Sequence, residues 1–217
     1  MGIRKRKIEA DYLKVGANFE FLGTGFSTID EKPNAQTREV QYVNDSSSTT
    51  TVTGYKREFD FESDQIQSDK AIEYIVNIAK EGKTGSDAET EYLRVDLDKP
   101  AKTSGYYARK FKVAIQVDEF PDNDGELGIS GSFLGIGDPI IGTFNVETKA
   151  FTEGFTGKTL EFTYNATGDV TEISNSKITF DKSENKFKGI PTDVTSFTFK
   201  DGGTLKTATL AETWNVA

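Results

Sequence analysis

Acidic residues gather in the short segment Pro121–Gly125 (PDNDG), which lies between two apolar stretches. Carboxylates that alternate ahead of a glycine occur in calcium-binding loops. Aligning Gly125 with the glycine of such a loop places Phe120 at the first ligand position and Gly131 at the last, where an aspartate and a bidentate glutamate are required. Two ligands are therefore missing. We interpret the segment as a tight turn, because Asn, Asp and Gly tolerate the positive φ of hairpin turns.

Two further patterns fall short of a catalytic or cofactor-binding motif. The glycine-rich run 131–137 has neither the spacing of a dinucleotide fingerprint nor the lysine of a phosphate-binding loop. Glu119 and Asp122 form a carboxylate pair of the kind that glycosidases use, but such pairs are common on an acidic surface. The chain has no histidine and no cysteine, which excludes Ser-His and Cys-His nucleophile pairs and thiolate metal sites. We therefore predict that the protein is not an enzyme and binds no metal or cofactor.

The composition indicates an acidic protein rich in β-structure. The 217 residues include 16 Phe and 8 Tyr, and aromatic and threonine-rich chains favour sheets. The net charge of −9 argues against binding nucleic acid through its phosphates. No apolar run approaches the length of a membrane span, and the basic start lacks the apolar stretch of a secretory signal. We expect synthesis in a cytoplasm and no membrane partner.

The sheet is expected to be organised around residues 111–142. Its first strand carries apolar residues at alternate positions, namely Phe111, Val113, Ile115 and Val117, so that one face is apolar and the other polar. After the turn, Leu127, Ile129 and Phe133 are expected to pack onto the same apolar face. The glycines that follow predict a reversal of the chain into a third strand.

A long hairpin is expected before this sheet, with arms at residues 36–44 and 49–61. The stretch Ser46–Thr53 is nearly all serine and threonine, which have little to bury, so the hairpin should protrude from the core. Two interpretations remain open. It is either a flexible surface loop or a pairing arm that becomes ordered against a neighbouring subunit.

Residues 68–82 predict the single helix, with Ser68 as N-cap and Gly82 at its end. Its apolar face would consist of Ile72, Ile75, Val76 and Ala79. The β-branched residues leave a strand as the alternative. Residues 1–17 form a charged arm with little to bury, expected either to touch nucleic acid or to become ordered against a partner.

The expected fold class is mainly β: an antiparallel β-sandwich or barrel with one flanking α-helix, plus a small C-terminal all-β module. We place the first domain at residues 1–155 and the module at 156–217. Strand-like runs are expected in the module at residues 160–164, 170–180, 186–190, 196–200 and 205–213. The module is either an immunoglobulin-like appendage or a set of strands that completes the first sheet.

Several segments together carry a family resemblance: the arm RKRKIEADYLKVG, the early strand FLGTGF, the polar hairpin, the stretch SDKAIEYIVNIAKEGKTGSDAETEYLRVDL and the stretch ARKFKVAIQVDEFPDNDGELGISGSFLGIGD. In these segments and their order the chain resembles the major tail protein, or tail tube protein, of long-tailed bacteriophages of Gram-positive bacteria. The resemblance covers roughly residues 1–155.

The resemblance implies a structural virion protein. Six copies would form a ring, and stacked rings would form the tail tube, a conduit for DNA ejection. The implied partners are further copies of the chain, the tape-measure protein, and the tail terminator and distal tail proteins. DNA would pass through the lumen without specific binding. The protein would assemble in the host cytoplasm and reside in the virion tail, with no cofactor.

The resemblance also assigns contacts between subunits and rings to the arm and to the hairpin tip. The residues concerned are Arg4, Lys5, Ile8, Tyr12, Asn44, Asp45, Ser46, Ser47, Ser48, Thr49, Thr50, Thr51, Val52, Thr53 and Gly54. Carboxylates that face the lumen would repel phosphate and let DNA slide. We expect Glu39, Glu58 and Asp60 in that role.

Two alternative functions remain open at this point. The chain could be a cell-surface or carbohydrate-binding β module that uses its C-terminal unit. It could also be the tube protein of a phage-like bacteriocin, which is physically the same assembly without a genome.

Overall fold

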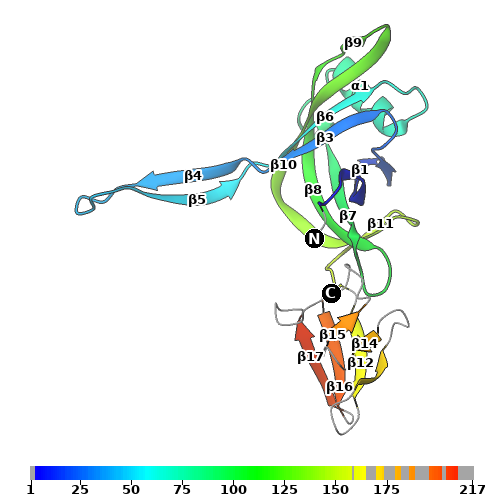
Figure 1. Ribbon diagram of the computed structural model, residues 1–217. Helices are drawn as coiled ribbons and strands as arrows, with labels where there is room; N and C mark the ends of the chain where they lie inside the picture. Colours follow the sequence, from blue (N-terminus) through cyan, green and yellow to red (C-terminus); the bar gives the residue numbers. More distant parts are fainter. Residues whose placement is uncertain are drawn as a thin grey trace. The chain divides into compact units, whose positions relative to one another are not determined.

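The computed structural model describes residues 3–157 and, beyond them, the strand segments 159–164, 170–173, 179–181, 186–188, 196–201 and 204–209 (Figure 1). The chain forms two compact units that interleave in sequence. One unit comprises residues 10–94 and 109–140. The other comprises the described residues within 1–9, 95–108 and 141–217.

The main sheet has the strand order β2-β1-β7-β8-β10-β6-β3, with β9 and β11 added to β10. Its strands are β1 (Glu9–Val15), β2 (Asn18–Phe21), β3 (Phe26–Lys32), β6 (Glu58–Asp64), β7 (Glu89–Pro100), β8 (Tyr106–Glu119), β9 (Asp122–Asn123), β10 (Glu126–Asn145) and β11 (Ala150–Glu153). The path has two free ends, so these strands do not close into a barrel by backbone pairing. The predicted antiparallel, mainly β fold with one flanking helix is confirmed.

Aromatic rings dominate the core on one face of this sheet. Phe59 contacts Tyr92 and Phe111, with ring centroids 4.6 and 4.8 Å apart. Phe61 stacks on Phe133 at 4.6 Å. All five side chains are almost completely buried. Since each buried aromatic removes a large apolar area from water, this cluster contributes strongly to the hydrophobic stabilisation of the sheet.

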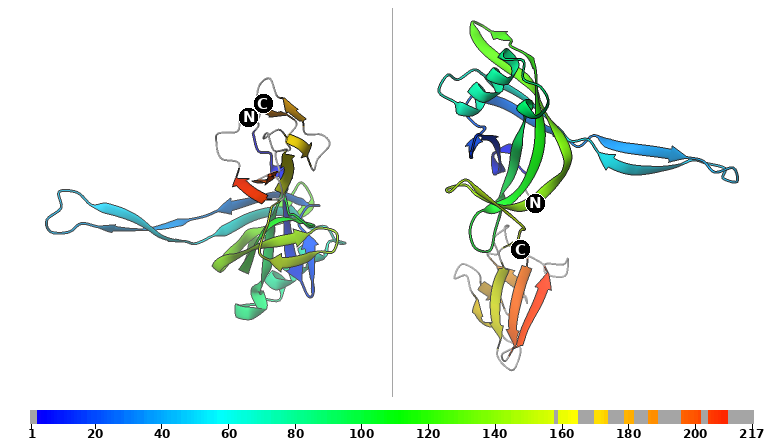
Figure 2. Two further views of the ribbon diagram at one scale, coloured as in Figure 1. Left: turned by 90° about the horizontal axis from the view of Figure 1, so that it is seen from below. Right: turned by 180° about the vertical axis from the view of Figure 1, so that it is seen from behind.

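The helix α1 (Lys70–Lys80) packs on the same core (Figure 2). The predicted N-cap Ser68 is wrong by one residue. The side chain of Asp69 caps the helix instead, accepting hydrogen bonds from the backbone N–H groups of Ala71 and Ile72 at 2.9 and 3.0 Å. The buried side chains of the helix are Ala71, Ile72, Ile75, Val76 and Ile78, and the position expected for Ala79 is only half-buried. Two short 3₁₀ turns, η1 (Arg6–Ile8) and η2 (Gly85–Ala88), complete the helical structure described.

The alternation expected in residues 111–117 is confirmed in β8, where Phe111, Val113 and Ile115 are buried. The turn before β10 is also confirmed. Asp122 accepts a hydrogen bond from the N–H of Gly125 at 2.7 Å, and Gly125 has a positive φ of 93°.

Two expectations for the strand that follows are wrong. Leu127 is exposed because it lies next to the turn, beyond the core. The glycine-rich reversal does not occur, since β10 runs unbroken from Glu126 to Asn145. Gly131 serves close packing instead of a turn: a Cβ there would lie 2.1 Å from the backbone oxygen of Gln116 on β8.

The prediction of a charged arm with little to bury is wrong from residue 9 onward. Residues Glu9–Val15 form β1, which pairs with β2 in the main sheet. Leu13 is fully buried, and Asp11 is buried beside it on the same strand. Asp11 occupies a core-facing position and breaks the apolar alternation, which concealed this strand in the sequence.

The C-terminal strands form sheets of their own: β13-β12-β16-β17, and a separate pair β14-β15. They are β12 (Thr159–Tyr164), β13 (Val170–Ile173), β14 (Thr179–Asp181), β15 (Lys186–Lys188), β16 (Ser196–Asp201) and β17 (Thr204–Thr209). Each expected run contains a strand, and β12 pairs with β16 in parallel. Within the expected runs, residues 174–178, 189–190 and 210–213 lie outside the described residues. The domain boundary at residue 155 stays a prediction.

Candidate assembly interface

The hairpin of β4 (Ala35–Val40) and β5 (Thr49–Tyr55) forms a two-stranded sheet separate from the main one. Val40 pairs with Thr49 next to the tip, and Ala35 pairs with Tyr55 at the base. Figures 1 and 2 show the hairpin extending away from β3 and β6. The expected hairpin is therefore present. The expected second arm, 49–61, is divided between β5 and β6, because the ladder breaks at Lys56 and Arg57.

The hairpin buries almost nothing. Every side chain from Ala35 to Tyr55 is exposed apart from the half-buried Val40 and Gly54. Four of the exposed residues are large and apolar, each at least half accessible: Tyr42, Val43, Val52 and Tyr55. An isolated two-stranded ribbon is marginally stable in water, and exposed apolar side chains favour association. The hairpin therefore combines an isolated ribbon with exposed apolar side chains, two features that are typical of surfaces that dock onto a partner.

The base of the hairpin is anchored to the main sheet by a few hydrogen bonds. The N–H of Lys56 donates to the oxygen of Asn34 at 3.1 Å, and the N–H of Gly135 donates to the oxygen of Arg57 at 2.8 Å. Asn34 has a positive φ of 47°, and its side chain donates to Glu58 at 3.1 Å. A hollow of about 640 Å³ lies at this base between the three segments 34–36, 56–58 and 134–135.

The hairpin-tip residues predicted as contacts, Asn44 to Gly54, thus lie together on one exposed element. The four predicted arm residues are divided. Arg4 and Lys5 are exposed, and Ile8 is half-buried. Tyr12 is buried within its own subunit, where its ring lies 5.3 Å from that of Phe21. Tyr12 therefore contributes to the fold of the subunit itself.

The three predicted lumen carboxylates do not form one group. Glu39 lies on the hairpin, where it accepts a hydrogen bond from Ser48. Glu58 and Asp60 lie on one face of β6, opposite the buried Phe59. Asp60 is paired with Lys32 and accepts from Ser132 at 2.9 Å. The hydrogen bond from Lys32 lowers the pKa of Asp60, so its charge is retained but locally balanced.

A buried charge network joins several strands inside the unit of residues 10–94 and 109–140. Arg94 donates to Asp11 at 2.9 Å and to Glu31 at 3.3 Å, and its guanidinium lies over the ring of Phe59. Arg109 donates twice to Glu31, at 2.7 and 2.8 Å. Buried charges are tolerated only when they are paired and hydrogen-bonded, and this network meets that condition.

This network was not predicted from the sequence. Tyr92 donates to Asp11, and burial raises the pKa of the Tyr92 hydroxyl well above its ordinary value. Asp11 lies two residues before the buried Leu13, and Arg94 lies two residues after the buried Tyr92. Residues two apart on a strand share a face, so both charged residues stand at core-facing positions. In the sequence, the signal for this network is a charged residue at a position where the alternation of the strand calls for an apolar one.

Among the residues that the structure describes, no group of acidic residues is arranged to hold a metal ion. Within the same part of the chain, no helix has the length and apolar character needed to cross a membrane.

No family model matches the chain, and no curated protein matches it. The solved structures to which the chain shows similarity include a chain in the tail of an empty gene transfer agent particle with C6 symmetry and a chain in the native gene transfer agent virion. Each has a TM-score of 0.45 and 14% identity, over 69% of this chain and 99% of that chain. A chain in the six-fold symmetrised baseplate of the anti-feeding prophage has a TM-score of 0.39 and 6% identity, over 68% and 97% of the two chains.

Proposed function

We propose that this chain is a structural virion protein, without enzymatic activity, that self-assembles into stacked hexameric rings and forms a phage tail tube. The observation that carries the proposal is the β4–β5 hairpin, which presents its apolar side chains to solvent with no core of its own. The sequence resemblance of residues 1–155 to tail tube proteins of Gram-positive phages supplies the identity of the partner, namely further copies of the same chain.

The physics of the hairpin favours a closed ring. A protruding ribbon has unpaired backbone groups on both edges, which can pair with a strand of another copy. When one surface patch of a copy contacts a different patch on the next copy, each added copy offers a free patch to another. Rotational symmetry closes such a series of copies into a ring. A ring of six copies would satisfy every hairpin without leaving a free edge.

The acidic character suits a conduit. Each copy carries a net charge of −9, and the part of this charge that faces the lumen would repel the phosphates of DNA and let it pass. Glu39, Glu58 and Asp60 are the carboxylates that we assign to the lumen, and Lys32 offsets part of the charge of Asp60. The further partners would be the tape-measure, tail terminator and distal tail proteins, with assembly in the host cytoplasm.

Negative-stain electron microscopy over a concentration series tests the proposal. Wild-type protein is expected to form rings or tubes. A variant in which residues 41–48 are replaced by Asn-Gly keeps both strands and shortens only the tip, and it is expected to stay monomeric. Wild-type protein that remains monomeric throughout the series would refute the function. Tubes formed by the shortened variant would refute the role of the hairpin.

A further inference from the structure

Arg4 lies among three carboxylates. Its guanidinium is 3.0 Å from Glu9, 3.2 Å from Asp96 and 3.0 Å from Asp98. We call Glu9, Asp96 and Asp98 the acidic recess. The side chain of Arg4 is 47% exposed, whereas that of Asp96 is 5% exposed. Asp96 of the recess is therefore buried, whereas Arg4, which provides the cation, is partly exposed at the surface.

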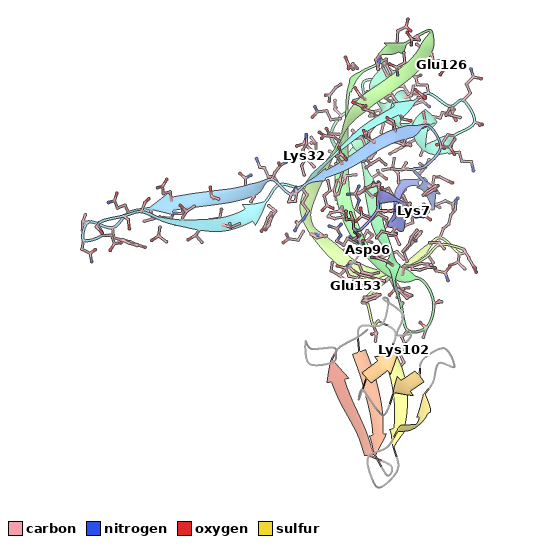
Figure 3. All side chains as sticks on the ribbon, in the orientation of Figure 1. Lys7, Lys32, Asp96, Lys102, Glu126 and Glu153 are labelled. Carbon is pink, nitrogen blue, oxygen red and sulfur yellow. The ribbon has the colours of Figure 1, made fainter. Side chains whose placement is uncertain are left out.

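The recess holds a hydrogen-bond acceptor that its own chain does not satisfy. The Oδ2 atom of Asp96 pairs with Lys99 at 2.6 Å and with Arg4. The Oδ1 atom is buried and has no hydrogen-bond partner among the described residues. A buried acceptor without a donor costs free energy, and most are satisfied in native proteins. Figure 3 labels Asp96, which lies on β7.

The acidic recess needs a cation to balance the charge of its carboxylates. Three carboxylates face two cations, Arg4 and Lys99. Removing Arg4 would leave three negative charges against one positive charge, partly shielded from water. An arginine suits the recess particularly well, because its planar guanidinium donates in several directions at once.

The segment that carries Arg4 is attached weakly. Ile3 is 94% exposed, and the 3₁₀ turn Arg6–Ile8 contains no buried residue. Apart from the Arg4 contacts, Arg6 donates to the backbone oxygen of Glu9 at 3.1 Å. Lifting residues 3–8 would therefore uncover little apolar surface, and the ionic contacts of Arg4 with the recess would break.

We propose that the acidic recess is the receptor for Arg4 of a second copy, so that the N-terminal segments are exchanged between copies when the protein assembles. This rests on the proposed self-assembly. Within one chain, Arg4 is tethered to Glu9 by only a few residues, and Oδ1 of Asp96 stays unsatisfied. An Arg4 that enters from a neighbour has no such tether and is free to donate to Oδ1 as well. Exchange of an identical segment between copies is a low-cost route to association.

Charge reversal in separate chains tests the exchange. Arg4→Glu and Asp98→Arg are each expected to raise the concentration needed for assembly about tenfold, the equivalent of 1.4 kcal/mol. In an alternating assembly of the two variants, every altered residue faces an opposite charge on a neighbour, so an equal mixture is expected to restore assembly. Lys7→Glu and Glu126→Arg make the same charge changes at exposed positions (Figure 3) and are expected to leave assembly unchanged.

The double variant R4E/D98R separates the outcomes. Restoration by the double variant and also by the mixture supports exchange. Restoration by the double variant alone overturns it, because the contact then stays within one chain. Single variants that assemble like the wild type, or a double variant and mixture that both fail although circular dichroism shows folded protein, overturn it as well. Wild-type protein that never assembles refutes the proposed function, and with it the exchange.

Discussion

Arg94 on β7 donates a hydrogen bond from Nη2 to the backbone oxygen of Ile29 on β3, at 2.9 Å. These strands are not neighbours, since β8, β10 and β6 lie between them along the sheet. The sheet must therefore curl until β3 faces β7. A guanidinium then bridges the two strands where backbone pairing does not, and Asp11 and Glu31 balance its charge.

Replacing Arg94 with methionine should strongly destabilise the fold. The change leaves Asp11 without its guanidinium partner and removes the bridge to Ile29. Loss of one partner of a buried ion pair costs about 3–5 kcal/mol. Urea unfolding at neutral pH measures the change. An exposed arginine, Arg38, mutated to methionine is the control, and a loss below about 1 kcal/mol for R94M would contradict the bridging role.

Acid should weaken the fold through Glu31. Burial by itself would raise the pKa of Glu31, but the hydrogen bonds and charges of Arg109 and Arg94 outweigh it, so the pKa lies below its ordinary value of 4.5. A carboxyl with a depressed pKa stabilises the fold fully above the ordinary value. This contribution is lost as the pH falls below 4.5 through the folded pKa.

Glu31→Gln should therefore be less stable than wild type at pH 7, and its free energy of unfolding should fall less on acidification. Urea titrations at a series of pH values measure the free energy of unfolding of both proteins and its dependence on pH. Parallel curves for the two proteins below pH 4.5 would show that Glu31 does not contribute to the acid sensitivity.

The helix cap distinguishes two neighbouring residues. Asp69→Ala should cost about 1 kcal/mol, because the Ala71 and Ile72 N–H groups lose their acceptor. Ser68→Ala should change the free energy of unfolding by less than about 0.5 kcal/mol. Thermal and urea unfolding compare the two variants, and equal effects would mean that the cap is not formed by Asp69.

Gly131 should not accept a side chain. A Cβ there would lie 2.1 Å from the oxygen of Gln116, so Gly131→Ala should cost about 1–3 kcal/mol through backbone displacement. Gly54→Ala is the matched control, because its added Cβ meets no atom within 4 Å. If both variants unfold at the same urea concentration, β8 and β10 do not approach as closely as described.

The exposed apolar residues of the hairpin should affect assembly without affecting the fold. Val43→Ser and Val52→Ser remove apolar groups that are already in solvent, so the free energy of unfolding should stay within about 0.5 kcal/mol of wild type. The concentration needed for assembly should rise. Ser46→Ala, a polar tip residue, is the control. Sedimentation velocity measures assembly, and an unchanged threshold for both valine variants would contradict docking through these side chains.

Much of the fold could be predicted where apolar residues alternate cleanly. Phe111, Val113 and Ile115 identified β8, and the PDNDG segment identified the turn, because both signals are local. Glycine in β10 was misread, since Gly131 can signal either a reversal or a close backbone approach, and only the neighbouring strand distinguishes them. The strand β1 was missed because Asp11, at a core-facing position, breaks the apolar alternation.

The candidate site could be predicted only in part. The serine- and threonine-rich hairpin was readable because a strand with nothing to bury must protrude or pair. The contacts of Arg4 could not be read, since Asp96 and Asp98 lie far along the chain and only the fold brings them together. Glu39 lies on the hairpin, whereas Glu58 and Asp60 lie on β6 of the main sheet. This separation depends on the break between β5 and β6, which no local sequence pattern predicts.

Amide hydrogen exchange of residues 41–53, compared between free and assembled protein, tests most directly whether the hairpin is completed by other copies. In the free subunit these amides should exchange rapidly, because the ribbon has no core. In the assembled protein their exchange should slow about tenfold or more. Equal exchange in both states, with assembly established by sedimentation in the same sample, would contradict the completion of the hairpin by other copies.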